Sequence, residues 1–283
     1  MPASRKNSNQ GFVKAYNNYE FLNSPSARTI RVLTEMVEPR ERLRQYRIHN
    51  TVVFFGSART LPRSEARKRF KEIEDKFKST KNPSAALQKS LDNAESNLLM
   101  SRYYEDAVAL SEKLTYWFQE PDIKDENFLI CTGGGPGIME AANRGAKKAN
   151  GRSIGLNISL PTEQNPNIYQ TKEISFEFHY FFIRKFWFFY LAKAMIVFPG
   201  GFGTFDELFE LLTIIQTEKT KKHMPIILFG KDYWEEVVNF KALVRWGMVS
   251  PDDLNLFKIC DDVNEAFIYL QAQLNEHYFN KKR

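Results

Sequence analysis

One stretch decides the fold of this chain: Pro199-Gly200-Gly201-Phe202-Gly203-Thr204-Phe205-Asp206-Glu207. The apolar run 194–198 precedes it and has the length and composition of a buried strand, while apolar residues at helical spacing follow it over 208–216. The pattern therefore predicts a strand, a glycine-rich turn and a helix. Glycines let the backbone turn tightly and let a ligand approach the amides. Free N–H groups and the dipole at the start of the helix favour an anion, so we expect a phosphate there.

Glu207 has two interpretations. In the first, Thr204 is the N-cap of the new helix and Glu207 is its third residue, a Thr-x-x-Glu capping box that needs no function. In the second, Glu207 is a catalytic carboxylate held one turn beyond the phosphate site. Spacing alone favours the capping box, because such boxes are common at helix starts.

A second glycine cluster has the same organisation. A strand is predicted over 127–132. It is followed by Gly133-Gly134-Gly135-Pro136-Gly137-Ile138-Met139-Glu140, and a helix continues over 141–149. Such a turn allows close backbone approach to phosphate or ribose, and the alternative is a tight turn with no ligand. The glycine spacing departs from the dinucleotide-binding fingerprint Gly-x-Gly-x-x-Gly, and the sequence contains no Gly-Lys-Ser/Thr phosphate loop.

Strand-like runs near positions 51, 127, 153, 194, 225 and 256 alternate with helical patterns. This alternation predicts an α/β fold, a doubly wound parallel sheet flanked by helices, with its ligand at the carboxyl ends of the strands. Gly56 and Ser57 directly follow the first strand. This position would allow Ser57 to donate a hydrogen bond to a nucleotide, and it is equally consistent with a turn or N-cap serine.

Three regions are predicted along the chain. Residues 1–50 form a polar, basic N-terminal extension that is partly disordered at its start, with a helix within 26–46 that is interrupted near Pro39. Residues 51–260 form the core, which contains a helical insert at about 60–98. Residues 261–283 form a C-terminal helix and a frayed tail.

Composition narrows the class of protein. With 43% apolar and 26% charged residues the chain is typical of a soluble globular protein, and its scattered net charge of +6 suits a small acidic substrate without requiring a nucleic-acid groove. Cys131 and Cys260 lie in apolar runs without a Cys-x-x-Cys spacing, which favours buried free thiols in a reducing cytoplasm. The first ten residues lack the apolar segment of a secretory signal. Nothing in the sequence indicates a metal cluster or an organic cofactor.

The segment 178–192 is apolar nearly all round and contains nine aromatic residues. A helix of this kind is buried or shared with a partner. The most apolar window of the chain is 178–198. It is interrupted by Arg184, Lys185 and Lys193, so we reject a membrane span. Charges in such a segment are costly unless they are paired, although long side chains often reach solvent past their apolar stems.

Together these motifs resemble the LONELY GUY (LOG) family, nucleoside 5'-monophosphate phosphoribohydrolases that are often mislabelled lysine decarboxylases. The central stretch matches Pro-Gly-Gly-x-Gly-Thr-x-x-Glu, and the second cluster is similar to Gly-Gly-Gly-x-x-Gly-Leu-Met-Gly-x-x-Ala, with Thr132 at the first Gly, Ile138 for Leu and Glu140 for the last Gly. The pair Arg184-Lys185 matches Met-x-x-Arg-Lys, with Phe181 where Met is usual. The resemblance covers roughly residues 51–260 without the insert, and its departures indicate a branch other than the plant cytokinin enzymes.

The resemblance implies a Rossmann-like fold and hydrolysis of the N-glycosidic bond of a nucleoside 5'-monophosphate, either AMP-like or a cytokinin riboside monophosphate as in cytokinin biosynthesis. Glu207 would stabilise the oxocarbenium-like ribose and orient a water, as carboxylates do in glycosidases, and Arg184 would keep Glu207 ionised. No second acid for the leaving base is apparent. The substrate-binding residues would be Gly56, Ser57, Gly133, Gly134, Gly135, Gly137, Lys185, Gly200, Gly201, Phe202, Gly203 and Thr204.

The aromatic helix and the insert together suggest a homo-oligomer, a dimer or larger, because LOG-like proteins pair through such helices. We expect neither nucleic acid nor a membrane as a partner. A first alternative is a non-catalytic nucleotide-binding or signalling module of the same fold. The presence of both Arg184 and Glu207 argues against it. A second alternative is a carrier or DNA-processing relative, which would require a longer basic and aromatic surface.

Overall fold

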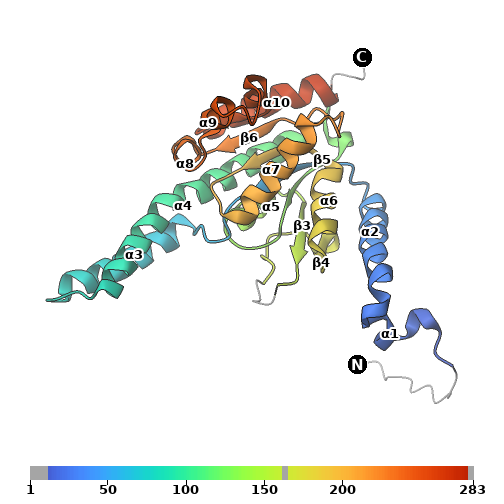
Figure 1. Cartoon of the computed structure of the whole chain (residues 1–283), viewed down its shortest axis with the longest axis horizontal. Helices are drawn as coiled ribbons and strands as arrows, with labels where there is room; N and C mark the ends of the chain where they lie inside the picture. The colour runs from blue at the N-terminus through green and yellow to red at the C-terminus, as the bar shows by residue number, and fades with distance from the viewer. Residues whose placement is uncertain (1–11, 161–164, 280–283) are drawn as a thin grey trace.

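A computed structural model describes residues 12–160 and 165–279 of the chain. Its strands form one parallel sheet in the order β4-β3-β2-β1-β5-β6-β7 (Figure 1). They are β1 (Asn50–Phe55), β2 (Phe128–Thr132), β3 (Ser153–Ile158), β4 (Ser175–Phe178), β5 (Ala192–Val197), β6 (Ile226–Phe229) and β7 (Lys258–Cys260). The predicted α/β, doubly wound parallel sheet is thus confirmed. Strand order reverses between β1 and β5, so this type of sheet opens its ligand crevice at their carboxyl ends.

Helices pack on both faces of the sheet. The described α-helices of the chain are α1 (Tyr19–Asn23), α2 (Arg28–Gln45), α3 (Arg63–Ser79), α4 (Ala85–Phe118), α5 (Ile138–Lys148), α6 (Phe181–Leu191), α7 (Phe202–Gln216), α8 (Lys231–Val237), α9 (Phe240–Arg245) and α10 (Val263–Leu274). Among the described helices, none is long and apolar enough to cross a membrane.

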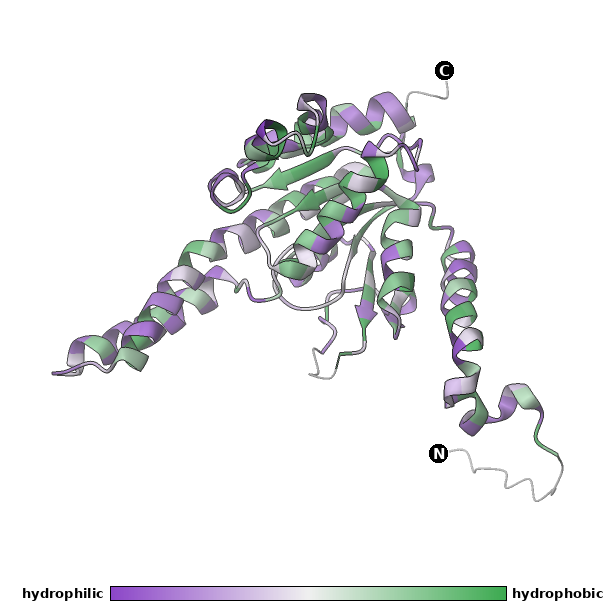
Figure 2. Cartoon of the chain, viewed as in Figure 1, coloured by the Kyte–Doolittle hydropathy of each residue, from purple (hydrophilic) through white to green (hydrophobic). Residues whose placement is uncertain are grey.

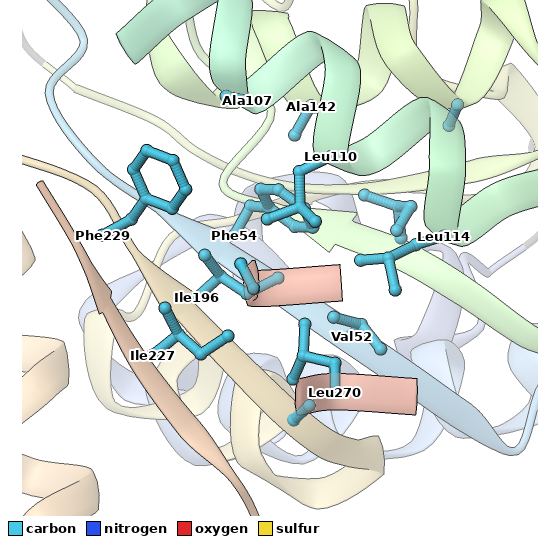
Figure 3. Packing of buried hydrophobic residues seen from close by; sticks show 14 of the residues in the cluster. Val52, Phe54, Ala107, Leu110, Leu114, Ala142, Ile196, Ile227, Phe229 and Leu270 are labelled. Carbon is cyan, nitrogen blue, oxygen red and sulfur yellow. The ribbon is translucent and has the colours of Figure 1, made fainter. Parts of the chain in front are cut away.

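Alternate side chains of β1 enter two separate cores, because successive residues of a strand point to opposite faces. Val52 and Phe54 pack with residues of α4, α5 and α10 (Figure 3). Val53 and Phe55 pack with residues of α2, α6, α7 and α8. All four side chains are at most 6% exposed. The second core is the one that fixes α6 and α7, which carry Arg184 and Glu207.

The N-terminal extension differs from its prediction. The helix α2 runs through Pro39 without interruption. Proline removes the bond to the carbonyl four residues earlier, here that of Glu35, and this carbonyl accepts a hydrogen bond from the indole Nε1 of Trp187 instead (2.9 Å). The predicted disorder over Met1–Gln10 and the predicted fraying of Lys281–Arg283 lie outside the described residues.

The predicted insert lies within a helical hairpin that extends away from the sheet (Figure 1). The helix α3 ends at Ser79 and α4 begins at Ala85. The helix α4 continues unbroken to Phe118, so it runs past position 98, where the insert was expected to end. Its first half packs on α3, whose surface is largely hydrophilic (Figure 2).

The sequence analysis missed one strand. No strand was predicted at β4, although Phe176 and Phe178 alternate with more exposed neighbours in the manner of an edge strand. The helices α8 and α9 are separate, and the Asn239 side chain caps α9 by accepting from the amide of Ala242 (2.9 Å). Cys131 and Cys260 are buried and free, as predicted.

Candidate active site

A cavity of about 600 Å³ opens at the carboxyl ends of β1, β2 and β5. It is lined by ten of the fourteen residues that the sequence analysis singled out: Gly56, Ser57, Gly133, Gly135, Arg184, Gly201, Phe202, Gly203, Thr204 and Glu207. Gly134, Gly137, Lys185 and Gly200 are not among the lining residues. The sequence reasoning missed other lining residues, among them Arg59, Met139, Asn157 and Asp206.

The glycine-rich turn before α7 leaves amides free at the cavity. The helix begins at Phe202, with Gly201 as its N-cap and no side-chain cap. Within the described chain, the amides of Phe202 and Gly203 have no hydrogen-bond acceptor, as expected for the first turn of a helix. Free N–H groups and the dipole at a helix N-terminus favour an anion.

The capping-box interpretation of Glu207 is therefore wrong. Thr204 lies inside the first turn, where its amide donates to the carbonyl of Gly201 (2.9 Å). Its side chain is 7% exposed and packs on Gly200, where an added Cβ would lie 2.1 Å from the Thr204 Oγ1. The hydroxyl of Tyr233 donates to the Gly200 carbonyl and fixes the turn from the other side.

Glu207 carries an unsatisfied carboxylate. The residue is 6% exposed, and its Oε2 has no hydrogen-bond partner among residues 12–160 and 165–279. Burial raises the pKa of Glu207 to about 7, against the opposing charges of Lys185 and Arg184. The expectation that Arg184 keeps this group fully ionised is corrected, because the effect of burial exceeds that of the two cations. Near neutral pH both protonation states are populated.

Arg184 enters the cavity from α6. Its Nε donates to the carbonyl of Leu156 (2.7 Å), its Nη2 donates to that of Gly133 (3.4 Å), and the guanidinium lies over the Phe188 ring at 5.1 Å. Burial lowers the pKa of Arg184, and the charge of Glu207 raises it. A Cβ at position 133 would lie 2.4 Å from the Nη2, so only glycine leaves room for the guanidinium.

Lys185, the neighbour of Arg184 on α6, does not reach the cavity. Its ammonium is 2.8 Å from a carboxylate oxygen of Asp206 and 2.6 Å from one of Glu210. Its side chain is 15% exposed and does not line the cavity. These two ion pairs therefore join α6 to α7, and the charge of Lys185 lowers the pKa of Glu207.

The backbone of Ser57 ties the two glycine-rich turns together. Its N–H donates to the Pro199 carbonyl (2.9 Å), and its carbonyl accepts from the amide of Ile138 (3.0 Å). A Cβ on Gly137 would lie 2.2 Å from that same carbonyl, and Gly137 has a φ of +70° that favours glycine. The Ser57 hydroxyl accepts from the Arg59 amide (3.1 Å), so the residue is a turn serine that also lines the cavity.

A buried amide network, missed by the sequence reasoning, holds the turn at 133–137. The Asn167 Nδ2 donates to the carbonyls of Gly134 and Gly135 (both 3.0 Å), and the Gln170 Nε2 donates to that of Gly134 (2.9 Å). Asn143 accepts from the Thr132 hydroxyl at 2.7 Å. The sequence signal that could have revealed this network is Asn143, a single polar residue on an otherwise apolar helix face.

Thr132 also explains a departure from the family motif. Its Oγ1 accepts from the amide of Gly134 (3.0 Å), so this side chain closes the turn where the family has glycine. Glu140, another departure, accepts a hydrogen bond from the Tyr104 hydroxyl (2.7 Å) outside the cavity. Neither substitution fills the space beside Glu207. Across the described residues, no group of three or more His, Cys, Asp or Glu side chains is arranged to hold a metal ion.

Comparisons with known proteins found a family model, curated relatives and solved structures. Residues 139–270 match a family model described as "Possible lysine decarboxylase". A protein of Escherichia coli strain K12 named pyrimidine/purine nucleotide 5'-monophosphate nucleosidase is 36% identical over 117 residues, covering 36% of this chain and 24% of that protein. Its counterpart in strain O157:H7 matches equally well. The chain thus spans about a quarter of the length of these curated relatives.

The solved structures that this chain resembles include the X-ray structure of TM1055, which is 19% identical with a TM-score of 0.45. That match covers 79% of this chain and 99% of the other. A molybdenum cofactor binding protein from Rippkaea orientalis is 21% identical, with a TM-score of 0.43 over 60% of this chain and 86% of its own. The family match, by contrast, includes Arg184, the turn at 199–203 and Glu207. Residues 139–270, a little under half of this chain, are thus the part that is similar to this family.

Proposed function

We propose that the chain hydrolyses the N-glycosidic bond of a nucleoside 5'-monophosphate, releasing the free base and ribose 5-phosphate. The observation that carries the proposal is the buried Glu207 carboxylate, whose Oε2 lacks a partner while the residue lines the cavity. A structural carboxylate would be paired, because a buried unpaired charge is costly. The names of the curated relatives support this class of reaction.

The phosphate would bind the free amides of Phe202 and Gly203 and the hydroxyl of Thr204. Glu207 follows Gly203 by four residues of α7, a rise of roughly 6 Å along the axis. The ribose would therefore lie along the first turn of the helix, with its anomeric carbon near the carboxylate. Gly133, Gly135 and Ser57 would line the opposite side of the sugar.

Bond cleavage builds positive charge on the ribose, and the ionised Glu207 would stabilise that charge and orient the attacking water. Arg184 would favour the ionised state of Glu207 and balance negative charge on the substrate. Its guanidinium is held by the carbonyls of Leu156 and Gly133, so its position does not depend on a ligand. This arrangement is preorganised for the charge that develops during cleavage.

The test is a panel of purine and pyrimidine nucleoside 5'-monophosphates, including AMP and a cytokinin riboside monophosphate, chromatographed for free base after incubation with purified protein. We expect release of base with an equal amount of ribose 5-phosphate. The matching nucleosides without phosphate should react far more slowly, because they cannot use the amides of α7. If every nucleotide survives while some bind, the domain is a non-catalytic nucleotide-binding module.

We further propose a cytoplasmic homo-oligomer, a dimer or larger, formed through α6. Phe181, Phe182 and Tyr190 on this helix are 53%, 55% and 46% exposed, and large exposed apolar patches mark interaction sites. The change Phe182→Asp should shift the mass measured by light scattering toward the monomer. Leu99→Asp, at a 70% exposed residue of α4, is the matched control and should leave the mass unchanged. A wild-type monomer at all concentrations would refute the oligomer.

A further inference from the structure

The N-terminal extension reaches the helix that carries Arg184. The helices α2 and α6 lie side by side (Figure 1). The Glu35 carboxylate accepts from the amides of His179 (2.8 Å) and Tyr180 (3.3 Å), immediately before α6 begins at Phe181. The α6 helix has no cap from the side chain of its own N-cap residue. Glu35 therefore supplies the acceptor oxygens and the negative charge that stabilise a helix N-terminus.

The backbone of Glu35 holds α6 at a second point. Its carbonyl accepts from the Nε1 of Trp187, a buried residue in the second turn of α6. Pro39 makes this contact available, because a residue with an N–H at that position would donate to the same carbonyl. One residue of the extension thus fixes both the start and the inner face of α6.

These contacts lead directly to the cavity. The amide of Arg184 donates to the carbonyl of Tyr180 (3.1 Å). The amide of Tyr180 in turn donates to the Glu35 carboxylate. From that backbone position the Arg184 guanidinium reaches the carbonyls of Leu156 and Gly133. A shift or fraying of the first turn of α6 would move the guanidinium relative to Glu207.

We propose that Glu35 is a positioning residue, through which the N-terminal extension sets the place of Arg184 in the active site. The positioning itself follows from the contacts in the ligand-free protein. Its kinetic consequence rests on the proposed nucleosidase function. The charged groups that face Glu207 are Arg184 and Lys185 from α6 and Asp206 and Glu210 from α7, and Glu35 contacts none of their side chains.

The test compares Glu35→Ala with Arg42→Ala. Arg42 donates to the carbonyl of Ser175 (2.9 Å) and lies over the Phe176 ring at 4.5 Å, so it joins α2 to β4 rather than to α6. The first readout is the pKa of Glu207 in nucleotide-free protein, followed by ¹³C NMR of labelled glutamate carboxyls and assigned with Glu207→Gln. Because the Arg184 charge lowers this pKa, Glu35→Ala should raise it, and Arg42→Ala should leave it unchanged.

The second readout is turnover. Glu35→Ala should lower kcat by roughly ten- to a hundredfold, change KM less, and move the acidic limb of the pH profile to higher pH. Glu35→Gln, which keeps one acceptor oxygen, should recover part of the lost kcat. If the alanine variant does not fold, Glu35→Gln is measured in its place. Equal effects in Glu35→Ala and Arg42→Ala, or a Glu207 pKa unmoved by Glu35→Ala, would overturn the proposal. If the wild type releases no base, the proposed function fails, and the NMR titration still decides the role of Glu35.

Discussion

Replacing Glu207 by glutamine should remove a loss of stability that the wild type suffers as pH rises, and it should abolish base release. The pKa of Glu207 is raised from 4.5 to about 7 by burial, so the folded state binds a proton that the unfolded state has already lost between these values. Stability is therefore lost as pH rises from about 4.5 to about 7, and the loss is complete above that range. At 1.36 kcal/mol for each pKa unit, the full penalty in the wild type is about 3 kcal/mol.

The magnitude is best measured as a difference between two pH values. The buried glutamine amide has its own cost, but that cost does not change with pH. The difference in free energy of unfolding, Glu207→Gln minus wild type, should grow by about 2.5 kcal/mol between pH 5 and pH 8. Urea denaturation followed by circular dichroism measures both proteins at each pH. Glu236→Gln, at an exposed glutamate of α8, is the matched control and should show no such growth.

A difference that stays constant from pH 5 to pH 8 would refute the reasoning, because it would mean that the Glu207 carboxylate is as well solvated in the folded protein as in the unfolded chain. A difference that shrinks would mean that Arg184 and Lys185 outweigh burial. In either case the unpaired Oε2 would no longer support a catalytic role. Activity gives the second check, since Glu207→Gln should retain nucleotide binding by calorimetry and lose turnover.

Three further predictions follow from the same geometry. First, kcat should rise with pH along an acidic limb centred near 7, because the ionised form of Glu207 is the active one and its pKa is about 7; a rate that is flat from pH 5 to pH 8 would contradict this. Second, Gly133→Ala should lower kcat by roughly a hundredfold while the thermal unfolding midpoint changes little. The added methyl group would lie 2.4 Å from the Arg184 Nη2 and would displace the guanidinium. Unchanged kinetics would show that the position of the guanidinium is unimportant. Third, Lys185→Ala should lower the free energy of unfolding by about 1 kcal/mol, measured by denaturation, because the ion pairs with Asp206 and Glu210 are lost. It should also move the acidic limb of the pH–rate profile to higher pH. An unmoved limb would exclude the Lys185 charge as an influence on Glu207.

The sequence was sufficient to predict the sheet because each central strand is a short apolar run followed by a turn. The two glycine-rich turns after β2 and β5 located the cavity for the same reason. Local pattern failed where tertiary contacts decide the structure. Pro39 stays within α2 because Trp187 takes the carbonyl that the proline leaves unpaired, and no pattern within 26–46 shows that partner.

The candidate site was predictable as a set of residue types but not as a set of contacts. Thr204 and Glu207 match a capping box in sequence, yet α7 begins two residues before Thr204 and leaves the carboxylate unpaired. The asparagines that hold the turn at 133–137 come from α5 and from the segment after β3, so their convergence depends on the completed sheet. The ionisation of Glu207 depends on burial, which spacing does not reveal.

The two backbone bonds of Ser57 have a consequence for how the site opens. They connect the ends of β1, β2 and β5, which lie up to about 140 residues apart in the chain, into one hydrogen-bonded unit. Neither bond can break alone without leaving a buried polar group unpaired, so the three turns should open together with the sheet. Amide hydrogen exchange at Ser57 and Ile138 should then be as slow as exchange in the central strands, and partly folded chains should have no affinity for nucleotide.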